Sequence, residues 1–133
     1  MNIKKDIENR EDVHLLVSQF YALIRKDERL GPIFNKHIQD WEEHIEKLTT
    51  FWENQLWFSK GYKGNPLEKH HEVDASMEYS ITQEHFGYWL QLWYATIENL
   101  FDGEMAKKAK SRARNMSTMF FIYMYQHRPM KKG

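Results

Sequence analysis

Apolar residues recur at intervals of three and four along most of this chain, and few helix-breaking residues interrupt them. The 133 residues include only three prolines and six glycines, which cluster between the periodic stretches. Strict alternation of apolar and polar residues, the pattern of a half-buried strand, is not found. The sequence therefore predicts an all-α protein, with residues 1–133 forming one domain.

The first predicted helix carries its apolar face from Val13 to Ile24. Gly31 and Pro32 follow, and we expect this pair to stop the helix, with the glycine in a left-handed cap. Phe34 would then lie in a tight corner.

The second long helix is predicted to begin after Asp40, whose carboxylate can cap the free amides of the first turn. It should run to about Ser59. His44, Leu48 and Trp52 are spaced by four residues, so they would lie on one face.

The helical pattern breaks in the segment 61–81, where we expect a loop and at most a short helix over residues 67–73. Thr82 is a suitable cap for a third long helix. Asp102 and the glycine after it separate a fourth helix, which must end by Arg128 because a proline follows. Periodicity alone fits crossed helix pairs and an up-and-down bundle equally well.

The composition excludes several classes of function. Lys plus Arg and Asp plus Glu both number 19, so there is no net field to gather nucleic acid or anionic lipid. No apolar run approaches the roughly 18 residues of a membrane span. The start of the chain is charged and lacks the apolar core of a signal peptide. Cysteine is absent, which agrees with a cytoplasmic location.

The histidines offer two kinds of metal chemistry. Glu68 and His71 form one Glu-x-x-His element of the type used by di-iron bundles. Such sites need a second copy, but residue 41, ahead of His44, is Trp rather than Glu. Heme is the second kind of metal site that the sequence allows. A histidine near residue 70 lies between helices that carry Tyr, His and Trp on apolar faces, and histidine is the usual axial ligand in gas-binding heme proteins.

Four stretches in the right order give the chain a close resemblance to the third group of truncated hemoglobins, over about residues 13–125. The resemblance is carried by Phe20-Tyr21 with Leu30-Gly31-Pro32-Ile33-Phe34, by Trp41-Glu42-Glu43-His44 with Phe51-Trp52, by Asn65-Pro66-Leu67-Glu68-Lys69-His70, and by Phe86-Gly87-Tyr88-Trp89-Leu90. This resemblance implies a two-over-two helical sandwich, a globin-like fold that encloses heme b.

The resemblance also implies roles for seven residues. His70 would be the proximal iron ligand, and it is favoured over the neighbouring His71 by the preceding motif. Three side chains would line the distal, gas-binding side: Tyr21, His44 and Trp89. Three more would lie against or near the porphyrin: Phe34, Leu48 and Trp52. His44 is expected to titrate near neutrality and so to respond to pH, and the resemblance does not settle whether it donates to the ligand, gates access or swings out to solvent.

The function that follows from the resemblance is reversible binding of dioxygen or another diatomic gas by a monomer. The same site would permit detoxification of nitric oxide or peroxide, for which an external reductase would have to supply electrons. A heme-free helical interaction module is the alternative from a different class.

Overall fold

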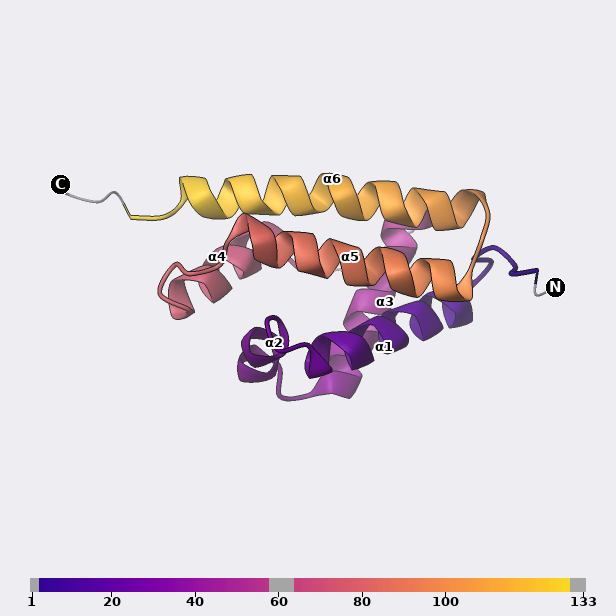
Figure 1. Cartoon of the computed structure of the whole chain (residues 1–133), viewed down its shortest axis with the longest axis horizontal. Helices are drawn as coiled ribbons and strands as arrows, with labels where there is room; N and C mark the ends of the chain where they lie inside the picture. Colours follow the sequence, from indigo (N-terminus) through magenta and orange to yellow (C-terminus); the bar gives the residue numbers. More distant parts are fainter. Residues whose placement is uncertain (1–2, 58–63, 130–133) are drawn as a thin grey trace.

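The computed structural model describes residues 3–57 and 64–129, and these residues form six helices (Figure 1). In chain order the helices are α1 (Arg10–Lys26), α2 (Gly31–His37), α3 (Trp41–Trp57), α4 (Pro66–Ser76), α5 (Gln83–Leu100) and α6 (Glu104–Gln126). The all-α fold class is therefore confirmed. The fourth predicted helix ends at Gln126, before Arg128 as expected.

Four long helices make two layers. Helix α1 packs on α3, and α5 lies beside α6 along its length (Figure 1). Contacts of α1 with α5 and of α3 with α6 join the two layers. The chain thus forms the crossed two-over-two arrangement rather than an up-and-down bundle.

The interface between the layers is aromatic. Phe20 and Trp93 are both fully buried, and their rings meet edge to face at 4.9 Å. Trp52 stacks on Trp93 at 4.5 Å from the other layer. The indole N–H of Trp93 donates to the carbonyl of Ala109. This contact needs small residues on α6, and Ala109 and Ala113 supply them, both fully buried.

The prediction for Gly31 is wrong in two respects. Helix α1 ends earlier, at Lys26, and Asp27 forms the next turn by accepting the backbone N–H groups of Arg29 and Leu30. Residues 31–37 then form α2 in place of a tight corner, with Pro32 in its first turn, where proline is tolerated. Glycine is needed because a Cβ on Gly31 would lie 2.8 Å from a backbone oxygen of α1, not because of a left-handed cap.

The segment before α5 is more regular than expected. Helix α4 has 11 residues, and its N-cap Asn65 accepts the backbone N–H of Glu68. It extends past Val73 because its C-terminal end is held by contacts with distant segments, described below. The predicted end of α3 near Ser59 lies outside the described residues.

An acidic side chain near the start of the chain caps α6. The two carboxylate oxygens of Asp6 accept the backbone N–H groups of Met105 and Ala106, each at 2.9 Å. Burial opposes ionisation of this carboxyl, but these hydrogen bonds outweigh it and lower the pKa of Asp6.

We expect Asp6→Ala to lower the free energy of unfolding by about 1–2 kcal/mol, the usual cost of losing a helix cap. Urea denaturation measures this change. Asp102→Ala, at an exposed neighbouring carboxylate, is the matched control and should cost less than about 0.5 kcal/mol. Equal losses in the two variants would contradict the capping role of Asp6.

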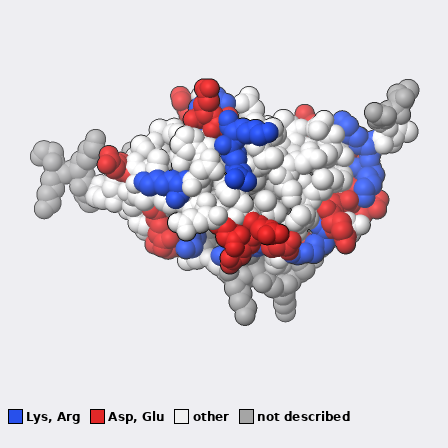
Figure 2. All heavy atoms as spheres, turned by 90° about the horizontal axis from the view of Figure 1, so that it is seen from below, with Lys and Arg blue, Asp and Glu red and all other residues white. Residues whose placement is uncertain are grey.

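Charged side chains of both signs are interspersed on the face drawn in Figure 2. This mixture agrees with the equal numbers of acidic and basic residues. In the described part of the chain, no helix combines the length and apolar character that crossing a membrane requires.

Candidate functional site

The predicted proximal histidine lies in the first turns of α4. The Nδ1–H of His70 donates to the carbonyl of Pro66 at 2.6 Å, one helical turn earlier. Its ring stacks on Phe120 of α6 at 4.4 Å and on Phe86 of α5 at 5.9 Å. The imidazole is therefore fixed by a backbone acceptor and by two aromatic rings.

This environment favours the neutral ring. Burial lowers the pKa of His70, and the hydrogen bond to Pro66 opposes that shift only in part. In the tautomer that the hydrogen bond requires, Nδ1 carries the proton and Nε2 carries the lone pair. A carbonyl acceptor on the far nitrogen is the usual support of a metal-binding histidine.

The neighbouring His71 has different surroundings. Its ring lies 5.6 Å from that of His127, at the C-terminal end of α6. Its Nδ1 is buried and has no hydrogen-bond partner among the described residues. His71 thus lacks the backbone acceptor that orients His70.

Two of the predicted distal residues meet directly. The ring of Tyr21 on α1 lies 5.5 Å from that of His44 on α3, edge to face. Trp41, one turn before His44, contacts both rings at 5.7 Å. Phe34 of α2 contacts Tyr21 at 5.8 Å. We call Tyr21, Phe34, Trp41 and His44 the distal cluster.

His44 points inward. Its Nε2 atom is buried and makes no hydrogen bond to any described residue. Burial lowers the pKa of His44 to about 4, and the charge on Lys47 adds to the shift. The expectation that His44 titrates near neutrality is therefore wrong, because a buried imidazole without an acceptor resists protonation.

We expect this burial to make the heme-free protein less stable in acid. An ordinary histidine pKa of 6.5 in the unfolded chain and about 4 in the folded chain means that the unfolded state binds more protons between these values. Stability is full above pH 6.5 and falls as the pH drops towards 4. The loss should be about 2–3 kcal/mol.

Urea denaturation at pH 4 to 7, for the protein and for His44→Gln, measures this loss as the difference between the two curves. Carboxylates titrate in both proteins and cancel in that difference. Parallel curves would show that His44 keeps its ordinary pKa in the folded chain.

Trp89 reaches the distal cluster through Phe20. Its ring lies 5.3 Å from that of Phe20, which precedes Tyr21 in the chain and contacts it at 4.9 Å. The two predicted porphyrin contacts on α3 differ in burial, since Leu48 is only partly buried and Trp52 is buried. Leu48 packs against the main core, and Trp52 is only 4% exposed because it stacks on Trp93.

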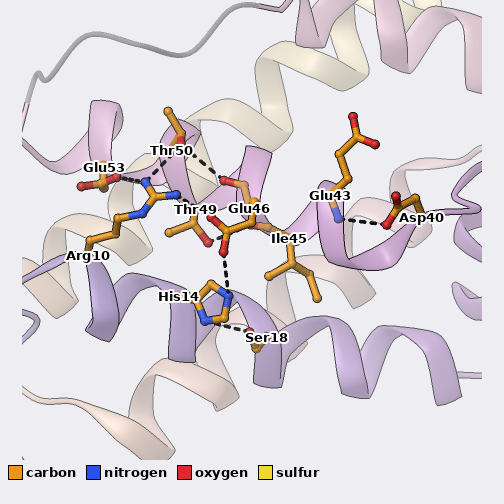
Figure 3. Close-up of polar contacts among 10 residues, drawn as sticks. All are labelled: Arg10, His14, Ser18, Asp40, Glu43, Ile45, Glu46, Thr49, Thr50 and Glu53. Carbon is orange, nitrogen blue, oxygen red and sulfur yellow. Dashed lines mark hydrogen bonds and ion pairs between the residues drawn. The ribbon is translucent and has the colours of Figure 1, made fainter.

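A polar network holds the distal helix α3 to α1 (Figure 3). The Arg10 guanidinium donates to the carboxylates of Glu46, at 2.9 Å, and Glu53. His14 Nε2 lies 3.3 Å from the other oxygen of Glu46. These bonds fix α3 from its outer side, while His44 occupies the inner side.

The residues surrounding the two histidines were not all anticipated. Trp41 could have been found, since it lies three residues before His44 and so on the same side of α3. The Pro66 acceptor also had a signal, because residues four apart are helical neighbours. No sequence pattern indicated the contact of His70 with Phe120, since 50 residues separate the two in sequence.

Comparison with known proteins agrees with this geometry. Residues 4–125 match the family described as bacterial-like globin. The chain is 32% identical to a group 3 truncated hemoglobin of Campylobacter jejuni over 123 residues, which cover 90% of this chain and 93% of the relative. The crystal structure of a group III truncated hemoglobin from that organism superposes with a TM-score of 0.82, over 96% of this chain and 100% of the other.

The chain belongs to the group III truncated hemoglobins. As a globin it is a heme-binding protein of a family that binds small diatomic ligands. The side chains of this truncated hemoglobin fit the group: His70 has the support of an iron ligand, and the buried, unpartnered Nε2 of His44 is a polar atom that a ligand could satisfy.

Proposed function

We propose that this truncated hemoglobin binds heme b through His70 and a diatomic gas, dioxygen foremost, on the side of the distal cluster. The observation that carries the proposal is the hydrogen bond from His70 Nδ1 to Pro66, because it leaves Nε2 as the atom for iron. When bound, heme supplies a ferrous iron at which a diatomic gas can coordinate.

The chain's own residues would set how long the gas stays. The Tyr21 hydroxyl and the Trp89 indole are hydrogen-bond donors, and a neutral His44 can donate through one ring nitrogen. Because the pKa of His44 is about 4, its protonation state would stay constant over the physiological range. The aromatic rings of the distal cluster would also lower the local polarity around a bound gas, which strengthens each polar contact to it.

Titration of the purified protein with hemin, followed by reduction under carbon monoxide, tests the proposal. A Soret band that saturates at one heme per chain and shifts under carbon monoxide would support it. A protein that stays colourless through the titration would favour a heme-free helical interaction module. A Soret band that does not respond to carbon monoxide or dioxygen would support heme binding but contradict the binding of a gas.

A further inference from the structure

The C-terminal end of α4 is fixed by an ion pair to a buried carboxylate, which the proposed gas chemistry does not use. Asp74 is completely buried. Arg128, just beyond α6, donates to both of its carboxylate oxygens, from Nε at 2.8 Å and from Nη2 at 3.0 Å. This two-point pairing fits the planar fork of arginine, which lysine cannot reproduce.

The pair also forms hydrogen bonds with the segment that leads into α5. Arg128 donates to the carbonyl of Ile81, and Asp74 accepts the backbone N–H of the same residue at 3.2 Å. We call Asp74, Ile81 and Arg128 the C-terminal clamp. It joins the end of α4, the segment just before α5 and the residue that follows the end of α6, and Arg128 lies 54 residues from Asp74 in the sequence.

A strained turn lies between two members of the C-terminal clamp, Asp74 and Ile81. Glu78 and Tyr79 have φ values of 58° and 59°, in the left-handed region that non-glycine residues seldom adopt. The Tyr79 N–H donates to the carbonyl of Asp74 at 2.7 Å. Such strain persists only where the surroundings over-determine the backbone, and the clamp supplies that constraint.

His70 lies one helical turn before Asp74, on the same side of α4. Near the other end of the helix, the Tyr123 hydroxyl donates to Glu68 at 3.0 Å. Two polar links, one to Tyr123 of α6 and one to Arg128 just beyond it, thus flank the stacking of His70 on Phe120. The clamp therefore acts on the same helix that carries His70.

We propose that Arg128, through Asp74, is a positioning residue for the proximal histidine, so that the segment just after α6 sets the orientation of the His70 ring toward iron. This inference rests on the proposed function, since it requires His70 to be the iron ligand. Arg128 acts through α4 and need not touch heme.

Arg128→Met in the heme-loaded protein tests the inference, because methionine keeps the length of the side chain and removes the fork. We expect a shift of the iron–histidine stretching band in the resonance Raman spectrum of the ferrous protein. Hemin loss to an excess of an acceptor globin should be roughly tenfold faster, the lower end of the effect of removing an outer-shell support. Arg128→Lys should give an intermediate shift. Amide hydrogen exchange in α4 should also be faster in both variants.

Arg29→Met is the matched control. It also removes an arginine that pairs with an aspartate, Asp27, but at the corner after α1, where its guanidinium lies over the ring of Tyr88 on α5. Its Raman band should equal that of the unmodified protein. Where Arg128→Met does not fold, Arg128→Lys carries the same test.

Two results would overturn different claims. An unchanged Raman band and hemin loss in the Arg128 variants, with only a lower melting temperature, would reduce the clamp to a stabilising contact and overturn the inference. An iron–histidine band that survives His70→Gly would instead overturn the assignment of His70 itself.

Discussion

Replacing His70 with glycine is expected to detach heme from its proximal ligand. Loss of an outer-shell support alone weakens metal binding by 10- to 100-fold, so loss of the ligand should speed hemin release by about a hundredfold or more. The Soret band of the ferrous protein should shift or disappear. Adding free imidazole should restore it, because glycine leaves a space of that shape between Phe86 and Phe120.

His71→Gly is the matched control, since it places the same helix-weakening residue one position along α4, at about 1 kcal/mol in each case. We expect its spectrum and hemin release to match those of the unmodified protein. The reverse outcome, with the spectrum lost in His71→Gly and kept in His70→Gly, would transfer the iron to His71.

Local signals made much of the fold predictable. Asp40 and Thr82 start helices where expected, because a cap acts on backbone N–H groups only three residues away. The apolar spacing of the long helices likewise reflects one face of each helix. The family resemblance then selected the crossed pairs, which periodicity could not distinguish from a bundle.

Contacts between distant segments were not predictable from pattern. Asp6 caps a helix that begins about 100 residues later, and Arg128 pairs with Asp74 across 54 residues. In the sequence, nothing distinguishes Asp6, Asp74 or Arg128 from an ordinary charged residue on the surface. Their partners are known only once the chain is folded, and the same holds for the length of α4, which the Asp74–Arg128 pair supports.

The sequence predicts that Tyr21 and His44 share one side of the heme, but it does not predict the electrostatics around His44. Tyr21 and His44 were expected on one side of the heme and do meet. The pKa of His44 was not foreseen, because it depends on how many rings surround the imidazole. Trp41 supplies one of those rings, and it had been expected on the same helix as His44 without a role in the site.

The Tyr21→Phe variant should release dioxygen 10 to 100 times faster. A hydrogen bond to a charged or strongly polarised group contributes about 1.5–3 kcal/mol, and each 1.4 kcal/mol is a factor of ten in a rate or equilibrium. Phenylalanine keeps the ring that contacts His44, Phe34 and Trp41, so the distal cluster should stay packed while one donor is lost. Stopped-flow exchange of dioxygen for carbon monoxide measures the off-rate directly.

Two comparisons separate this electrostatic effect from a change in packing. Carbon monoxide is less polarised when bound, so its off-rate should change much less than that of dioxygen in the same variant. Tyr94→Phe removes a hydroxyl whose hydrogen bond, to the Lys110 carbonyl, lies outside the distal cluster, and it should leave both rates unaltered. An unchanged dioxygen off-rate in Tyr21→Phe would remove Tyr21 from ligand stabilisation and leave His44 and Trp89 as its donors. Equal acceleration for both gases would instead mean that the hydroxyl shapes the pocket without bonding to the ligand.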